Sequence, residues 1–258
     1  MNDSIDKNLA MTPQQRQFAA GKTHPLAAYK EVMVGDGSWS RFFAFELYRL
    51  FFAGTESFIG IALRLITLPL FFKSCGKGLV VGHGCTIRQA QRIEIGKKVI
   101  IDDYCLVDVR TKADQNTESF VKIGDYSYIG RFSIVSAKYG KITLGKACNI
   151  GSNSRIATQG EIEIGDSTLI SSFVYIGGGN HGSDDLEKPI MEQEMELKGG
   201  VKIGANCWIG TKATIVDGVK IGNNAIIGAH SLVREDVPDN AVVAGTPAKI
   251  IKYRDGKN

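Results

Sequence analysis

Aliphatic side chains recur at every sixth position over most of this chain, usually beside a glycine. In the strands of an ordinary β-sandwich, apolar and polar residues alternate with a period of two, which does not explain a period of six. The period predicts a solenoid whose three-sided coils are about 18 residues long, with one inward aliphatic side chain on each side. The series is Ile95, Ile101, Val107; Ile123, Ile129, Val135; Leu144, Ile150, Ile156; Ile164, Ile170, Ile176; Ile203, Ile209, Ile215; and Ile221, Ile227, Val233.

Interruptions of this period indicate where loops leave the stack. Successive triplets start 28, 21, 20, 39 and 18 residues apart, so two insertions are long. The first covers 108–121 and the second 177–202, and loops on a rigid scaffold commonly carry function. A weaker set, Val81, Ile87 and Ile93, predicts an irregular first coil, because its step to Ile95 is too short for a full turn. We therefore expect a mainly β solenoid of about six to seven coils over 77–237.

Residues 37–76 differ in composition from the repeats and are rich in Phe, Leu and Ile. They predict two helices, at about 39–53 and 55–73. The apolar run that contains Arg64 is short for a bilayer span and charged near its middle, so we expect no spanning helix. Two interpretations of 38–74 stay open. The helices lie on a membrane surface, or they pack against the solenoid or a neighbouring subunit.

The two ends of the chain show no six-residue period. Residues 1–36 predict a loosely held N-terminal arm. Residues 238–258 predict a C-terminal cap, either a short helix or an extended segment, because an open last coil would expose unpaired backbone. The polar N-terminus lacks a secretory signal pattern, which favours a cytoplasmic location.

Composition excludes several classes of function. The net charge is only +4 and Lys and Arg are scattered, so the sequence gives little support for nucleic-acid binding. The five cysteines form no C-x-x-C motif, which argues against a disulfide framework and against a tetrahedral zinc site. Buried free thiols in a reducing compartment fit better.

The run VKIGANCWIGTKATIVDGVKIGNNAIIGAHSLVREDVPDNAVVAGTPAKIIK, residues 201–252, resembles the C-terminal signature of hexapeptide-repeat acyltransferases, which fold as left-handed parallel β-helices. It is most similar to the galactoside, maltose and capsule or colanic-acid O-acetyltransferase branch. The resemblance implies a homotrimer with active sites in the clefts between adjacent solenoids. It further implies acetyl-CoA as the donor, a carbohydrate as the acceptor, and no metal.

His181 is the candidate catalytic base. Acyl transfer to a sugar hydroxyl needs a group that removes the hydroxyl proton, and imidazole suits this role near neutral pH. His181 lies in the longer insertion, within IGGGNHGSDD, where the resembling family places its catalytic histidine. Backbone N–H groups at Gly177 to Gly179 are candidate donors to the oxyanion, and Asp184 and Asp185 are candidates to orient the imidazole or bind sugar.

The resemblance also implies binding residues. Asn153 and Trp208 match positions that bind the sugar and line the cleft. Thr211 and Ala229 match the small residues along the pantetheine arm of CoA, and Lys249 and Lys252 match cations that meet its phosphates. Many relatives have Thr-Lys where this chain has Arg234-Glu235, so Arg234 is expected to substitute for the missing lysine.

Other functions on the same fold are alternatives to O-acetyl transfer. An N-acetyltransferase on an amino sugar nucleotide, or a long-chain acyltransferase, would use the same fold. A non-catalytic trimeric scaffold would be consistent with the Arg234-Glu235 departure. A γ-class carbonic anhydrase would need three converging histidines, and the spacing of His83, His181 and His230 does not favour it.

Overall fold

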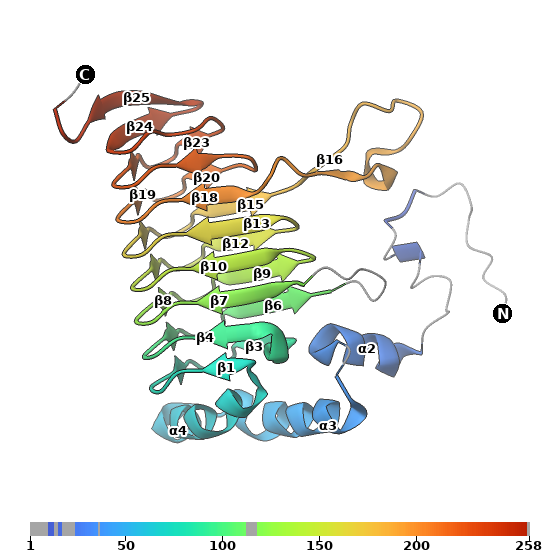
Figure 1. The fold of residues 1–258 in the computed structure, drawn as a ribbon. Coiled ribbons are helices and arrows are strands. Elements are labelled where there is room, and N and C mark those ends of the chain that lie inside the picture. The colour runs from blue at the N-terminus through green and yellow to red at the C-terminus, as the bar shows by residue number, and fades with distance from the viewer. Residues whose placement is uncertain (1–9, 13–14, 17–23, 36, 112–117, 257–258) are drawn as a thin grey trace.

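The computed structural model describes residues 10–12, 15–16, 24–35, 37–111 and 118–256. Three parallel sheets run the length of a stack of triangular coils, which makes the described chain a left-handed parallel β-helix with helices at its N-terminal end (Figure 1). Sheets A and C each contain seven strands and sheet B nine, so seven full coils are followed by a partial one. The expected fold class and coil number are confirmed.

The strands are short, and their bounds follow the coil. Sheet A contains β1 (Ser74–Cys75), β4 (Ile93–Ile95), β7 (Phe120–Ile123), β10 (Lys141–Leu144), β13 (Glu161–Ile164), β18 (Val201–Ile203) and β21 (Lys220–Ile221). Sheet B contains β2 (Val80–Val81), β5 (Ile100–Ile101), β8 (Tyr128–Ile129), β11 (Asn149–Ile150), β14 (Leu169–Ile170), β19 (Trp208–Ile209), β22 (Ile226–Ile227), β24 (Ala241–Gly245) and β25 (Ala248–Tyr253). Sheet C contains β3 (Thr86–Arg88), β6 (Leu106–Arg110), β9 (Ile134–Lys138), β12 (Arg155–Thr158), β15 (Tyr175–Gly178), β20 (Thr214–Ile215) and β23 (Leu232–Val233).

The six-residue series forms the core. Ile95, Ile123 and Leu144 pair in register along sheet A, and the equivalent positions of sheets B and C pair in the same way. Every residue of the series is buried. Because the coils stack, the aliphatic columns form one continuous core rather than separate clusters.

The first coil differs from the expectation. Val81 pairs with Ile101 and Ile87 with Val107, but the third member of the triplet is Cys75, which pairs with Ile95. Ile93 belongs to the next coil, where it begins β4. The 20-residue step from Cys75 to Ile95 holds a full coil, so this coil is regular and only its cysteine hid the pattern.

Side chains also join one coil to the next at the corner between sheets A and B. The carboxylate of Asp125 accepts a hydrogen bond of 2.7 Å from the backbone N–H of Lys97, and Asp166 accepts one of 2.7 Å from Lys146. Asn223 repeats the contact with the N–H of Ala205 at 2.9 Å. These bonds satisfy corner N–H groups that no strand partner reaches.

Helices cover the N-terminal end of the stack. They are α2 (Pro25–Val34), α3 (Trp39–Tyr48) continued by a π-helical turn (Arg49–Ala53), and α4 (Ser57–Thr67) continued by a 3-10 turn (Leu68–Phe71). The two helices expected within 37–76 therefore form. A loosely held arm was expected over 1–36, but residues 25–34 form helix α2 and pack on the fold. Met33 and Val34 are buried, and Gln89 of the first coil donates to the carbonyl of Glu31 at 3.2 Å. No helix in the described residues combines the length and hydrophobicity that crossing a bilayer requires.

Arg64 anchors α4 to the first coil. Its side chain is fully buried, Nε donates to the carbonyl of Val81 at 2.8 Å, and Nη1 donates to the carbonyls of Thr55 and Phe52 at 2.7 and 3.1 Å. The guanidinium thus satisfies carbonyls from the coil and from the bend between the helices.

We expect Arg64→Met to lower the free energy of unfolding by about 3 kcal/mol, because the carbonyls would remain buried without donors. Urea denaturation measures the change. Lys122→Met, on the exposed outer face of sheet A, is the control and is expected to stay within about 0.5 kcal/mol of the unmodified protein. Equal stability of the two variants would contradict the anchoring role.

The C-terminal cap is an extended hairpin rather than a helix. β24 pairs in parallel with β22 and continues sheet B, while β25 folds back antiparallel along β24. The antiparallel strand gives the last parallel strand a partner within the chain. Within the predicted range, the extended alternative is the one that forms.

Candidate active site

The chain leaves the stack at the corner between sheets C and A, directly after β15. Two short strands, β16 (Asn180–His181) and β17 (Met195–Glu196), pair antiparallel, and a 3-10 turn (Ile190–Glu192) lies beyond them. Figure 1 shows this excursion, residues 179–199, projecting sideways from the coils. β15 continues to Gly178 and β6 to Arg110, so both insertions begin after longer strands than the six-residue period predicts.

Asp217 holds the base of the excursion. One carboxylate oxygen accepts from the N–H of Lys198 at 2.6 Å and the other from the N–H of Gly200 at 2.8 Å. Asp217 is buried, and a side-chain carbon added at Gly178 would lie 3.0 Å from its carboxylate. The carboxylate therefore fixes the point where the chain returns to the stack, close to where it departs.

His181 is exposed on β16, opposite Met195. The next residue reinforces the hairpin, because the N–H of Gly182 donates to the carbonyl of Glu194 at 2.8 Å. The imidazole is thus presented by a hydrogen-bonded hairpin whose base is held by a buried carboxylate. This arrangement places a base where a substrate can reach it.

The two aspartates after His181 differ in their surroundings. Asp185 is engaged within the excursion: it accepts from the N–H of Glu187 at 3.1 Å and pairs with Lys188 at 3.0 Å. The hydrogen bond and charge of Lys188 hold the pKa of Asp185 below its usual range. Asp184 is exposed. Asp185 therefore stabilises the loop, which leaves Asp184 as the candidate for sugar binding.

The expected binding residues lie on another part of the coil. Trp208 is on the outer face of sheet B and half exposed, with its indole N–H donating to the hydroxyl of Ser171 at 3.2 Å. Asn153, Thr211 and Ala229 occupy the corner between sheets B and C in the fourth, sixth and seventh coils. Thr211 donates to the carbonyl of Ser172 at 2.6 Å. Within one chain, these four residues lie along one edge and His181 at a different corner.

The cationic candidates lie at the C-terminal end of the stack. Lys249 and Lys252 are exposed on β25, and Arg234 is exposed just after β23. The acid in the Arg234-Glu235 pair has a partner: the Glu235 carboxylate is 3.4 Å from the ammonium group of Lys249. Glu235 thereby neutralises one of the two lysines that the resemblance assigns to phosphate.

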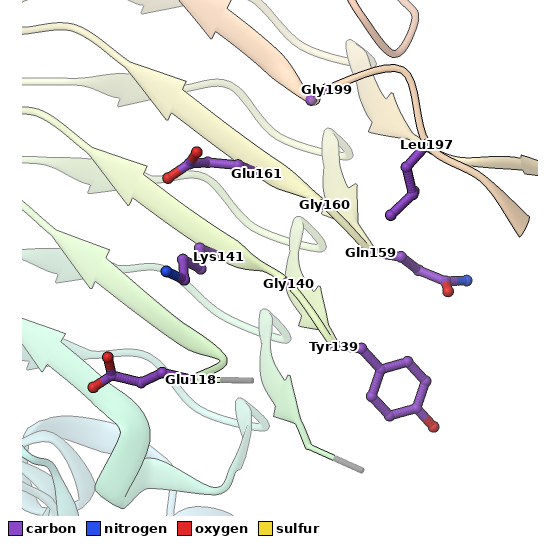
Figure 2. A pocket seen from close by; sticks show the side chains of 10 residues that line it. Glu118, Tyr139, Gly140, Lys141, Gln159, Gly160, Glu161, Leu197 and Gly199 are labelled. Atoms are coloured by element: carbon purple, nitrogen blue, oxygen red, sulfur yellow. The ribbon is translucent and has the colours of Figure 1, made fainter. Parts of the chain in front are cut away.

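An open pocket of about 520 Å³ runs along the corner below the excursion. Figure 2 shows Tyr139 and Gln159 projecting from this corner, with Lys141 and Glu161 on the adjoining strands of sheet A and Leu197 above them. Because Leu197 follows β17, the pocket adjoins the hairpin that carries His181. Its lining combines polar side chains, among them Lys141, Gln159 and Glu161, with a larger share of apolar surface, as small-molecule sites commonly do.

The described residues contain no cluster of three or more His, Cys, Asp or Glu that would hold a metal. His83 and His230 lie at the corner between sheets B and C in coils far apart along the stack, away from His181. The five cysteines are free, and Cys207 lies at the corner between sheets A and B, where burial raises its pKa. This geometry favours neither a zinc site nor a cysteine nucleophile beside His181.

Asp217 is the site residue that the sequence analysis missed. The sequence does contain a signal for Asp217. It lies two positions after the inward Ile215, where a second inward side chain is expected and a carboxylate is unusual. Thr158 occupies the equivalent position two coils earlier and accepts from the N–H of Gly160 at 2.8 Å. A polar residue at this inward position marks a corner that needs a hydrogen-bond acceptor.

We expect Asp217→Ala to release the base of the excursion, because the buried N–H of Gly200 and the part-buried N–H of Lys198 lose their acceptor. Protection of the amides of Lys198 and Gly200 against hydrogen exchange should fall by about tenfold or more, while sheet B amides keep theirs. Asp185→Ala, which alters the tip of the same excursion, is the comparison. Unchanged exchange at Lys198 and Gly200 would contradict the proposed anchor.

Comparison with known proteins supports the class that the fold defines. Residues 200–235 match the sequence family described as Bacterial transferase hexapeptide (six repeats). Galactoside O-acetyltransferase of Escherichia coli is 31% identical over 52% of this chain and 64% of the relative. The dTDP-4-amino-4,6-dideoxy-D-glucose acyltransferase of Escherichia coli is 29% identical over 72% of this chain and 84% of the relative.

A solved structure agrees with these relatives. The crystal structure of the polySia specific acetyltransferase NeuO is 25% identical, covers 69% of this chain and 80% of its own, and superposes with a TM-score of 0.51. The chain spans about half the length, 44% and 53%, of two further acetyltransferases, from Mycobacterium tuberculosis and Escherichia coli. The fold is that of the left-handed β-helix transferases. In sequence and in fold, the chain is similar to hexapeptide-repeat acyltransferases.

Proposed function

We propose that the protein is an acetyl-CoA-dependent O-acetyltransferase that acts on a sugar hydroxyl of a polysaccharide or lipid-linked glycan precursor. The observation that carries the proposal is the exposed His181 on an anchored hairpin of a hexapeptide solenoid. Relatives named as galactoside O-acetyltransferase and polySia specific acetyltransferase support a carbohydrate acceptor. A cytoplasmic location, where acetyl-CoA is supplied, is part of the proposal.

In this mechanism His181 acts as general base. The imidazole removes the proton from the acceptor hydroxyl as its oxygen attacks the thioester carbonyl of acetyl-CoA. The carbon–sulfur bond then breaks, the sulfur leaves with its electron pair, and the imidazolium returns the proton to that sulfur. Backbone N–H groups at Gly177 to Gly179 are candidates to stabilise the oxyanion. The step is balanced without an acyl-enzyme.

The site is proposed to lie between two copies of the chain in a homotrimer. In one chain His181 lies at the corner between sheets C and A, whereas Trp208 lies on the outer face of sheet B. A cleft that uses both would therefore combine the excursion of one copy with sheet B of its neighbour. Asn153, Trp208, Thr211 and Ala229 would then form the wall facing the neighbour's His181.

The outer faces of the three sheets support this assembly. The outward positions of sheet A are mostly charged or polar: Glu94, Lys122, Thr143, Glu163, Lys202 and Lys220. Those of sheets B and C include Ile100, Leu169, Trp208, Leu106, Ile134 and Tyr175. At the corner that joins B to C, the rings of Tyr104 and Phe132 stack with centroids 5.2 Å apart, and both are about half exposed. Apolar surface on two adjoining faces suits contact with further copies.

The CoA phosphates are proposed to meet Arg234, Lys249 and Lys252. Glu235 opposes this role because its carboxylate lies 3.4 Å from the ammonium group of Lys249. We expect Glu235→Gln to tighten CoA binding by about two- to threefold, since an exposed ion pair contributes about 0.5 kcal/mol. Isothermal calorimetry with CoA measures the change, and the gain should shrink with dephospho-CoA, which lacks the 3′-phosphate. Weaker binding by the variant would contradict a competing carboxylate.

The activity is tested with purified protein, acetyl-CoA and a panel of glycans and lipid-linked saccharides. Mass spectrometry should detect one added acetyl group, and alkali should remove it because it is an ester. Absence of transfer to every sugar in the panel, together with failure to bind CoA, would favour the non-catalytic scaffold instead.

N-acetylation of an amino sugar nucleotide is the second candidate. Its support is the similarity to the dTDP-4-amino-4,6-dideoxy-D-glucose acyltransferase, because this chain matches 84% of the length of that relative. The same panel separates the two, since an amide product withstands alkali that removes an ester. A donor series of acyl-CoA chains and acylated carrier protein tests long-chain transfer in the same assay.

A further inference from the structure

Helix α4 is inverted relative to an ordinary surface helix. Its fully buried positions are Gly60 and Arg64, so its single charged side chain faces the protein. Water-facing helices instead turn charge outward and apolar residues inward. The exposed side chains of α4 are almost all apolar: Phe58, Ile59, Ile61, Ala62, Leu65 and Ile66. A face of this kind is suited to an apolar phase rather than to water.

The apolar surface continues beyond α4 over the neighbouring helix and turns. We call the exposed side chains of Phe43, Leu47, Leu50, Phe51, Phe58, Ile59, Ile66 and Leu70 the base surface. Four of them, Phe58, Leu70, Leu50 and Ile66, are exposed by 79%, 78%, 74% and 67%. Figure 1 shows α3 and α4 lying end to end across the base of the stack. The base surface is therefore an elongated strip at the end of the solenoid, opposite to the C-terminal cap.

The charges around this strip are mainly positive. Residues 38–77 contain two acids, Glu46 and Glu56, and Arg49 pairs with Glu46 at 3.0 Å. Apart from the buried Arg64, the basic residues of the same range are Arg41, Arg49, Lys73 and Lys77, of which Lys73 pairs with Glu94 at 2.9 Å. Trp39, at the start of α3, is partly exposed beside them. Apolar side chains bordered by cations and an aromatic ring have the chemistry of a helix that lies in the interface of an anionic bilayer.

We propose that the base surface binds the surface of an anionic lipid bilayer, with the solenoid axis standing away from the membrane. This orientation rests on the proposed trimer, because parallel solenoids around one axis would place three base surfaces in one plane. Three modest contacts then act together, so the trimer binds more tightly than one chain would. The excursion with His181 would lie several coils above the lipid, within reach of the glycan of a lipid-linked acceptor.

Vesicle co-sedimentation tests the proposal on the full-length protein. The probes are vesicles of phosphatidylglycerol and phosphatidylethanolamine, and vesicles of phosphatidylcholine alone. The protein should sediment with both and more completely with the anionic ones. Phe58→Ser, Ile66→Ser and Leu70→Ser should each weaken binding by about tenfold, because a large apolar side chain no longer leaves water. All three positions are largely exposed, so the fold should not change.

Ile251→Ser is the matched control, since Ile251 is 63% exposed on β25 at the opposite end of the stack. It should bind vesicles as the unmodified protein does. The chain has two tryptophans, so a Trp208→Phe background leaves Trp39 as the reporter. Its emission should shift to the blue on vesicles and be quenched by brominated lipid.

Two results would overturn the proposal. One is that the protein sediments with neither the anionic vesicles nor those of phosphatidylcholine. The other is end-to-end association of trimers that the three serine variants abolish while vesicles bind no protein, which would make the base surface a protein interface. Failure of the proposed enzyme activity is separate: His181→Ala should lose acetyl transfer and still sediment with vesicles.

Discussion

His181→Ala is expected to lower kcat/KM for acetyl transfer by about 10²–10⁴-fold, the usual contribution of a positioned general base. The side chain is exposed on β16 and the hairpin is held by backbone hydrogen bonds and by Asp217, so the variant should keep its fold and its affinity for CoA. Steady-state kinetics with a soluble acceptor glycan measures the loss, and calorimetry with CoA checks binding.

The matched control for this experiment is Asp184→Ala, three residues further along the same excursion. Asp184 is exposed, and as a sugar-binding residue its loss should raise KM for the acceptor more than it lowers kcat. His181→Ala should instead lower kcat. If His181→Ala retains full activity, the general-base assignment is wrong and another group must remove the hydroxyl proton.

Mixed trimers provide the second large expected effect. A copy carrying His181→Ala lacks the proposed base, and a copy carrying Asn153→Ala with Trp208→Ala lacks the proposed facing wall. Each homotrimer should be almost inactive. In trimers assembled at random from equal amounts of the two, about a quarter of the clefts combine an intact histidine with an intact wall. Activity should therefore return to about a quarter of that of the unmodified protein.

The result distinguishes a shared cleft from a site within one chain. If every catalytic residue came from one copy, mixing would restore nothing, because each copy carries a defect. Sedimentation analysis should show a trimer for both variants and for the mixture. Recovery in a preparation that is monomeric would contradict the shared cleft, since no second copy would be present to complete it.

Much of the fold follows from the sequence because each coil repeats the same local rule. An aliphatic side chain every sixth residue fixes three sides and one core, and neighbouring coils reinforce the register. The first coil escaped the pattern only where Cys75 replaces an aliphatic residue. The antiparallel cap and helix α2 were not predicted in form, because both depend on partners distant in the chain and not on local periodicity.

The candidate site was predictable to a smaller extent. The insertion that carries His181 is visible as a break in the period, since a rigid repeat makes any extra residues conspicuous. Asp217 was missed because its role depends on Lys198 and Gly200, which reach it only when the excursion closes. Likewise, spacing did not distinguish Asp185, which pairs with Lys188, from the exposed Asp184.

The sequence by itself determined the solenoid, its interruptions and the position of His181, because these depend on side chains repeated or absent at fixed steps. Only the tertiary structure decided which residues share a corner. His181 lies between sheets C and A, whereas Trp208 lies on sheet B and Asn153 at the corner beside it. It also decided that Arg64 turns inward and leaves α4 with an apolar outer face. The direction in which a helix faces depends on the carbonyls that the first coil offers, and these exist only once that coil has formed.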